Sequence, residues 1–249
     1  MMAISYAAAP VAVRDDLAAA HAQAWTALAA PGTWWTGAER VAIAAETRAA
    51  RDCKLCLARK QALSPAAVAG AHDRRTTLPE AVVDVAHRIA SDPARLSRRW
   101  FEDVTANGIS DAHYVEALAV IVRTVSIDSF CRGIGLAPHA LPEAQPGEPA
   151  RHRPAGAKGG EAWVPLVAVS DATGPEADLY GGARRAPNVV RALSLVPDEV
   201  RLLRALAPSH YVPFERVPDP SFAPPGRALS RAQMELIAAR VSVLNECFY

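Results

Sequence analysis

The sequence carries almost no net charge and has no long apolar run. Its 27 Lys and Arg residues nearly balance 26 Asp and Glu residues, which gives a formal charge of +1. Proteins that bind phosphate backbones normally show a basic excess, so nucleic acid is not expected as a partner. The apolar residues 115–122 are soon followed by Arg123 and Asp128, well short of the about 20 residues that span a membrane. No basic segment precedes the apolar residues 1–13, so we expect no signal peptide, no membrane partner and a cytoplasmic location.

Cysteine is scarce as well, with four in 249 residues. Cys53 and Cys56 stand three positions apart, and Cys131 and Cys247 are isolated. This pattern does not resemble the disulfide framework of a small secreted protein, and it fits thiols in a reducing compartment. The composition, 51% hydrophobic and 21% charged, is typical of a globular chain that folds by burying apolar surface.

Alternating β-branched runs are nearly absent, whereas alanine and other apolar residues recur at helical spacing. The sequence therefore predicts an all-α fold. Thr36 and Glu39 have the spacing of a capping box, in which each side chain accepts a hydrogen bond from the backbone of the other residue. Helices are expected over about residues 13–30, 36–51, 53–63, 79–90, 93–106 and 110–132, and near residues 188, 197 and 230; a short strand fits only residues 163–169.

A stretch rich in proline and glycine, residues 137–165, separates two helical regions and is expected to be a linker or arm. The two regions show an internal similarity. Aligning Cys247 with Cys53 also places Ser230 and Gln233, a second capping-box pair, on Thr36 and Glu39. We therefore predict two tandem helical units, residues 1–136 and residues 166–249, joined by the linker.

The Cys53-Lys-Leu-Cys56 pair places two thiols one helical turn apart, close enough to form a disulfide. A free thiol is only about 3% ionised at pH 7, so a reactive thiolate needs nearby positive charge or a proton acceptor. Lys60 lies four residues beyond Cys56 on the same helix face, and Glu46 lies two turns before Cys53. Glu116, on the long apolar helix, is a further candidate for handling protons.

Other interpretations of these residues remain open. A Cys-x-x-Cys pair without a second Cys or His pair is a poor zinc site, and the seven histidines show no HxxxH or HExxH spacing. We therefore expect no metal and no cofactor. The two thiols can also be small buried side chains in a helical core, as expected for Cys131, and Lys60 and Glu46 can be ordinary solvated helix residues.

Residues 234–249, taken with the helical repeat, resemble the alkylhydroperoxidase D and carboxymuconolactone decarboxylase family. In that family a glutamate twelve residues before a cysteine leads into Cys-x-x-Cys-x-x-x-His, and Glu235 and Cys247 match this separation. The chain looks most like the two-unit peroxidase-related members, and the likeness extends over nearly its whole length. The segments that carry it are residues 31–40, 114–116, 126–130 and 191–197.

The resemblance implies a peroxide-reducing cycle in which Cys56 attacks a small peroxide, Cys53 resolves the product, and a dithiol reductant restores both thiols. It also implies a homo-oligomer. The chain departs from the family pattern at the glutamate position of the first unit, which is Val41, and at the histidine position, which is Lys60. In the second unit the sequence ends at Tyr249, one residue before the second cysteine.

The preferred hypothesis is a cytoplasmic thiol-dependent peroxidase whose candidate site residues are Cys53, Cys56, Glu46, Lys60, Glu116, Glu235 and Cys247. The alternative is a catalytically degenerate helical scaffold that acts by oligomerisation or partner binding.

Overall fold

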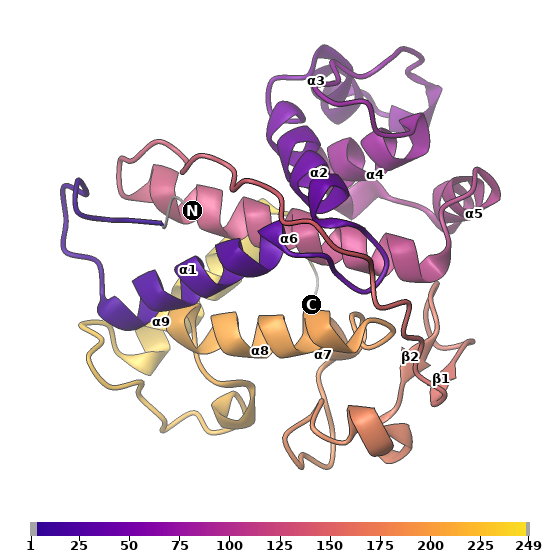
Figure 1. The fold of residues 1–249 in the computed structure, drawn as a ribbon. Helices are drawn as coiled ribbons and strands as arrows, with labels where there is room; N and C mark the ends of the chain where they lie inside the picture. The colour runs from indigo at the N-terminus through magenta and orange to yellow at the C-terminus, as the bar shows by residue number, and fades with distance from the viewer. Residues whose placement is uncertain (1–3, 248–249) are drawn as a thin grey trace.

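A computed structural model describes residues 4–247 and confirms the all-α fold (Figure 1). Two short antiparallel strands are the only sheet in this part of the chain, and they pair Ala157 with Val167 and Lys158 with Leu166. The elements are α1 Asp15–Ala29, α2 Gly37–Ala49, α3 Lys54–Gln61, α4 Glu80–Ser91, α5 Arg98–Ala106, α6 Asp111–Gly133, β1 Ala157–Lys158, β2 Leu166–Val167, α7 Asn188–Arg191, α8 Pro197–His210 and α9 Arg231–Leu244.

Both predicted capping boxes form, at Thr36 with Glu39 and at Ser230 with Gln233. One predicted helix, over residues 93–106, is divided. Pro93–Arg95 is a short 3-10 turn, and α5 starts only after Ser97, whose extended backbone ends the turn and whose hydroxyl accepts the Trp100 N–H at 3.2 Å. Because the Ser97 side chain stabilises a new helix start, the apolar spacing that predicted one helix is divided between two elements.

The core lies around α6, which runs through the middle of the molecule (Figure 1). Helices α2 and α4 pack on α6 and on each other, and α1 packs against α2 and α8. Apolar side chains at helical spacing fill the space between them. Fully buried examples are Ile43, Ala44, Ala86, Val115, Val120, Ile121 and Ile127.

The segment predicted as a linker is tied to the protein body rather than loose. Gln145 N–H donates to the carbonyl of Ala29 at 2.8 Å, and Arg151 N–H donates to that of Thr33 at 2.7 Å. Gly37 lies where these segments meet, and a Cβ there would come within 2.2 Å of the Ala29 carbonyl oxygen. The turn between α1 and α2 is therefore held by backbone hydrogen bonds to a segment about 115 residues further along the chain.

The similarity between α2 and α9 extends to their capping boxes but not to their surroundings. Helix α2 buries residues that include Ile43 and Glu46, whereas α9 buries Arg231 and Met234 and leaves most of its other side chains exposed. The end of the second predicted motif, at Tyr249, lies outside the described residues. The two-unit organisation stays a prediction.

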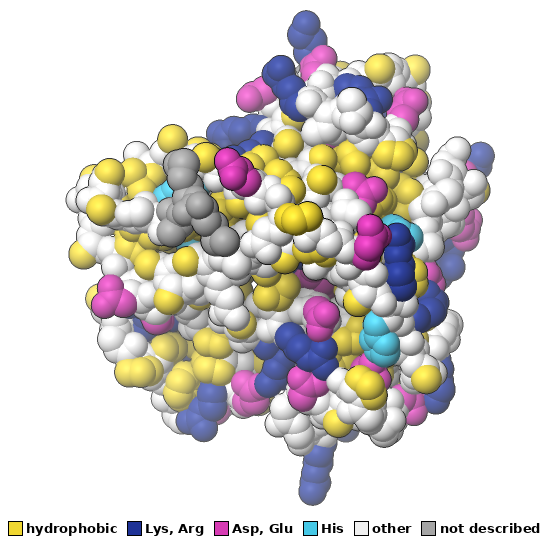
Figure 2. Space-filling view, viewed as in Figure 1, with side chains coloured by type: hydrophobic (Ala, Val, Ile, Leu, Met, Phe, Trp, Pro, Cys, Tyr) yellow, Lys and Arg dark blue, Asp and Glu magenta, His cyan; other side chains and the backbone are white. Residues whose placement is uncertain are grey.

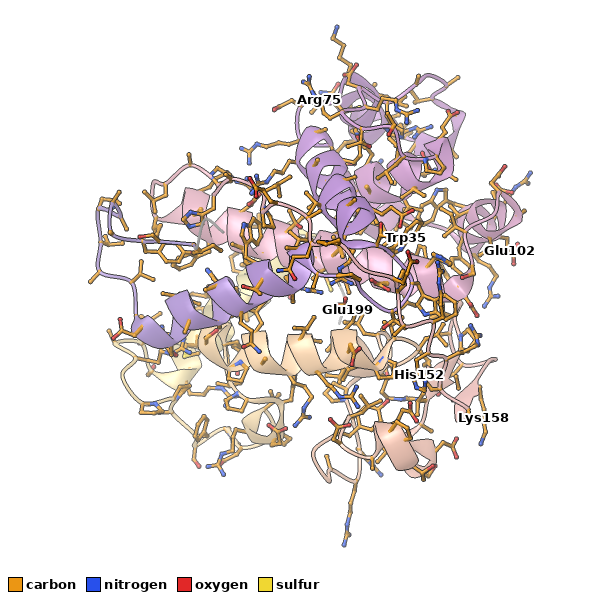
Figure 3. The ribbon with its side chains drawn as sticks, viewed as in Figure 1. Trp35, Arg75, Glu102, His152, Lys158 and Glu199 are labelled. Carbon is orange, nitrogen blue, oxygen red and sulfur yellow. The ribbon has the colours of Figure 1, made fainter. Side chains whose placement is uncertain are left out.

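Four buried charged side chains join α2, α6 and α8. Arg40 of α2 pairs with Glu116 of α6 and, at 2.9 Å, with Glu199 of α8, and Arg123 of α6 also pairs with Glu199. Figure 3 labels Glu199 beside the facing helices. The positive charges of the two arginines balance the negative charges of the two glutamates. A charged side chain that is buried away from solvent needs such a partner.

The surface carries mixed charge. On the face drawn in Figure 2, basic and acidic side chains are interspersed with hydrophobic ones. None of the helices in the described part of the chain is long and apolar enough to cross a bilayer.

Removing Glu199 should destabilise the fold strongly. Glu199→Ala leaves Arg123 buried without its carboxylate and Arg40 with one partner fewer, so we expect a loss of about 3–5 kcal/mol in the free energy of unfolding. Chemical denaturation followed by circular dichroism measures it. Glu102→Ala, at the exposed edge of α5 (Figure 3), is the control and should change stability by less than about 0.5 kcal/mol. Equal losses in the two variants would contradict the role given to the buried network.

A buried histidine contact joins α1 to α8. His21 is fully buried, its Nε2 lies 2.5 Å from Nε2 of His210, and its Nδ1 contacts the hydroxyl of Tyr6. Burial, with smaller contributions from His210 and His139, lowers the pKa of His21 to about 4. Burial, with smaller contributions from the positive charges of Arg227 and Arg14, also lowers the pKa of His210.

The protein should therefore lose stability in mild acid. His21 binds a proton more tightly in the unfolded chain, where its pKa is about 6.5, than in the folded protein. The contribution of neutral His21 to the free energy of unfolding is therefore complete above pH 6.5 and is lost as the pH falls from 6.5 to 4, by up to about 3 kcal/mol. Denaturation curves across this range measure the loss. His21→Phe should flatten the slope relative to the wild-type protein, and an unchanged slope in His21→Phe would contradict the assignment.

Candidate functional site

The two cysteines of the Cys-x-x-Cys pair meet at the start of α3 and are both free thiols. Cys53 is the N-cap residue of α3, and Cys56 lies in its first turn; both side chains are buried. Asp73, in the segment before α4, fixes this helix start: its carboxylate accepts the Lys54 N–H at 2.8 Å, and its own N–H donates to Cys53 Sγ at 3.4 Å. Burial opposes ionisation, but the N–H groups of Asp73 and Cys56 outweigh it and lower the pKa of the Cys53 thiol.

Helix α4 contributes His87, which connects Cys56 to a buried carboxylate. His87 Nδ1 lies 3.3 Å from Cys56 Sγ, and Nε2 lies 3.0 Å from Glu46 Oε2. Glu46 also accepts the N–H groups of Arg75 at 2.8 Å and Thr76 at 2.6 Å; Figure 3 labels Arg75 beside the helices that form the site. The side chains of Glu46 and His87 are fully buried, so this pair is shielded from water.

The charges of this pair follow from its contacts. Burial disfavours the carboxylate, yet the hydrogen bonds from Thr76, His87 and Arg75 hold the pKa of Glu46 below its usual range. Burial lowers the pKa of His87 despite the neighbouring Glu46. A neutral His87 that donates from Nε2 to Glu46 leaves a lone pair on Nδ1, directed at the sulfur.

A second histidine reaches the cysteines from the segment between α3 and α4. His72 Nδ1 lies 3.6 Å from Sγ of both Cys53 and Cys56, and its Nε2 lies 3.0 Å from Asp84 Oδ1. Asp84 also accepts hydrogen bonds from Arg59 at 3.1 Å and from the Trp100 indole at 2.7 Å. The segment before α4 and three helices therefore hold His72 in place.

His72 and Asp84 stabilise each other's charged forms. Burial works against both, but the hydrogen bonds to Asp84 and to the two thiols raise the pKa of His72 to about 10. The hydrogen bonds from His72 and Trp100 lower the pKa of Asp84 to about 2. This half of the site is an ion pair beside the sulfurs.

Cys56 also faces a cavity of about 630 Å³ between α2, α3, α4 and α6. The charged residues that line it are Arg48, Arg51, Lys60, Asp128 and Arg132. Arg48 forms two hydrogen bonds of 2.8 Å to Asp128, which Arg132 also approaches. Four basic side chains against one carboxylate make this cavity electropositive, and Cys56 is the only residue of the pair that lines it.

The structure brings together some of the residues predicted from sequence and separates others. Glu46 is connected to Cys56 through His87, and Lys60 lies exposed at the edge of the cavity. Glu116 is placed elsewhere: its carboxylate contacts Arg40 and the Trp34 N–H, and burial raises its pKa. Glu116 is therefore a member of the buried charge network, and none of these contacts connects its carboxylate to the cysteines.

The second-unit candidates are also separate from the site. Glu235 is exposed and pairs with Arg231 at 2.5 Å, and Cys247 is exposed beyond the end of α9. In the described part of the chain, neither belongs to the Cys53–Cys56 cluster.

Sequence reasoning missed His72, His87 and Asp84. Their spacing from the two cysteines in the sequence matches no short motif. They reach the cysteines only because residues 62–79 fold back between α3 and α4. One signal was present: His87 falls among Val83, Ala86 and Ile89 on α4, and a histidine on an apolar face requires a buried polar partner. Asp84, one turn before it, lies on the same helix.

Comparisons of the chain with protein-family models, with curated proteins and with solved structures found no match. The site is therefore interpreted from its own geometry.

Proposed function

We propose that the protein is a thiol-dependent peroxidase that cycles Cys53 and Cys56 between dithiol and disulfide. The observation that carries this proposal is the continuous contact from Glu46 through His87 to Cys56, with Cys56 lining an electropositive cavity. A buried base next to a thiol and an approach for a small oxidant are the two features that thiol chemistry needs.

The first step oxidises Cys56. His87 Nδ1 takes the thiol proton, and the Cys56 thiolate attacks one peroxide oxygen; the O–O bond breaks, sulfenic acid forms on Cys56, and the alkoxide or hydroxide leaves with the proton held by His87. Glu46 keeps the imidazole in the orientation that accepts and returns this proton.

The second step forms the disulfide. The Cys53 thiolate attacks the Cys56 sulfur, the S–S bond forms and the S–O bond breaks, and the departing oxygen takes up the proton that the Cys53 thiol has lost and leaves as water. The net reaction converts two thiols and one hydroperoxide into a disulfide, an alcohol and water, and an external dithiol then reduces the disulfide. The lowered pKa of Cys53 suits it to this attack, and the ligand atoms of the cluster lie within 4.8 Å of one another.

The family relationship, the cytoplasmic location and the homo-oligomer belong to the same proposal. A reducing compartment would keep the three buried thiols reduced. The exposed apolar side chains of α9, Leu236, Ile237, Val241, Val243 and Leu244, are compatible with self-association, which stays a prediction.

Peroxide consumption by reduced, metal-free protein with dithiothreitol as the dithiol tests the proposal. Cys56→Ser should abolish turnover. With dithiothreitol removed, Cys53→Ser should reduce one equivalent of hydrogen peroxide and stop, with a sulfenic acid on Cys56 that dimedone traps. His87→Asn should slow the reaction about 10²-fold, the usual loss when a positioned acid–base group is removed.

Cys131→Ala is the matched control, because this third buried thiol lies outside the cluster and should leave turnover unchanged. Turnover that persists in Cys56→Ser, or wild-type protein that consumes no peroxide, would overturn the proposed function.

A further inference from the structure

Four soft or borderline ligand atoms converge at the proposed redox site. Sγ of Cys53, Sγ of Cys56, Nδ1 of His72 and Nδ1 of His87 all lie within 4.8 Å of one another. His72 Nδ1 lies 3.6 Å from each of the two sulfurs, and His87 Nδ1 lies 3.3 Å from Cys56 Sγ. Two thiols alone would explain a disulfide, but they do not explain why two imidazoles point the same nitrogen at them.

These distances match the edges of a zinc tetrahedron. With Zn–S of about 2.3 Å and Zn–N of about 2.0 Å, a tetrahedral ion separates its sulfur and nitrogen ligands by about 3.5 Å. Three of the six ligand-to-ligand distances therefore already fit, and the others, none above 4.8 Å, would have to close to a tetrahedral edge when a metal binds. Two cysteines and two histidines are also the donor set typical of closed structural zinc sites.

The contacts behind the ligands favour the same interpretation. His72 presents its Nε2 to Asp84, and His87 presents its Nε2 to Glu46, each at 3.0 Å. In metal sites, a carboxylate behind the distal nitrogen of a histidine fixes the ring and makes the ligating nitrogen a stronger donor. Both histidines have this support, and Asp73 N–H adds a hydrogen bond to Cys53 Sγ.

Few apolar contacts stabilise the region around the cysteines, so a bound metal ion could add to its stability. The small apolar cluster around the cysteines consists of Ala50, Cys53, Leu55 and Cys56, with Val68 and Ala90 beside it. The segment between α3 and α4 has only a 3-10 turn at Pro65–Ala67 as regular structure. An ion held by His72 would connect this segment to α3 and α4, and ligand binding that requires the folded arrangement stabilises it.

We infer that Cys53, Cys56, His72 and His87 form a tetrahedral Zn²⁺ site in the reduced protein. All four positions are filled by side chains, so the ion serves structure and control rather than binding a substrate. The inference shares its thiols with the proposed function but does not depend on it.

Metal binding and disulfide formation exclude each other, because both use the two thiolates. Oxidation of the loaded site by a hydroperoxide would take two electrons from the thiolates: the S–S bond forms, the O–O bond breaks, the two oxygens take up two protons from solvent and leave as alcohol and water, and Zn²⁺ is released. The bound ion therefore protects the thiols, and its loss would expose them to peroxide.

Titration of reduced, chelator-treated protein with Co²⁺ tests the site. We expect one equivalent per chain, with the intense visible bands of tetrahedral cobalt and a near-ultraviolet thiolate-to-cobalt band, and displacement by Zn²⁺. His72→Ala should weaken binding at least 10-fold, and Asp84→Asn, which does not touch the ion, by about 10- to 100-fold.

The controls are His113→Ala and Cys131→Ala, a histidine and a cysteine outside the cluster, and both should bind Co²⁺ as the wild type does. His72 lies in a segment without regular helix, so its variant should fold even if His87→Ala does not; circular dichroism verifies this. Absence of stoichiometric binding, an octahedral spectrum, or unchanged affinity in folded His72→Ala would overturn the inference.

The peroxide assay on the same metal-free preparation separates the two proposals. Protein that binds cobalt but consumes no peroxide refutes the peroxidase and supports the metal site. Protein that consumes peroxide but binds no cobalt refutes the metal site and supports the peroxidase.

Discussion

The site depends on the need to satisfy one buried carboxylate. Glu46 is shielded from water, and a buried carboxylate without hydrogen-bond donors would cost several kcal/mol. Two backbone N–H groups, from Arg75 and Thr76, and the His87 imidazole supply these donors. This requirement connects α2 to α4 and to the segment before α4. It also determines which nitrogen of His87 faces Cys56.

The same orientation supports two kinds of chemistry that cannot occur together. A lone pair on His87 Nδ1 can accept the Cys56 proton or bind a cation, but it cannot do both. His72 has the same contacts, with Asp84 behind it and both sulfurs in front, but it is protonated in the metal-free site and must release its Nδ1 proton to bind a cation. Occupancy by metal would therefore decide whether the thiols are available to an oxidant. In the proposed cycle, the electropositive cavity beside Cys56 would be the approach for that oxidant.

Much of the fold could be predicted from local sequence signals, whereas half of the site could not. Apolar spacing and capping pairs such as Thr36 with Glu39 are local, so the helix positions followed from them. The Cys-x-x-Cys pair and Glu46 were also found from local spacing, but α2 ends at Ala49 and α3 begins at Lys54, so Glu46 reaches Cys56 through His87 and not along one helix face. His72 and His87 depend on how residues 62–79 turn back, which no local pattern encodes. Glu116 was a candidate for handling protons, but its carboxylate pairs with Arg40 of α2, which apolar spacing along α6 does not reveal.

The most direct test of this account is the tautomer of His87 in reduced, metal-free protein, measured by nitrogen-15 NMR of the imidazole ring. If Glu46 orients the ring as described, Nε2 carries the proton and Nδ1 does not, and Glu46→Ala abolishes that preference. A proton fixed on Nδ1 in the wild-type protein would contradict the account, because that nitrogen could then neither accept the Cys56 proton nor bind a metal ion.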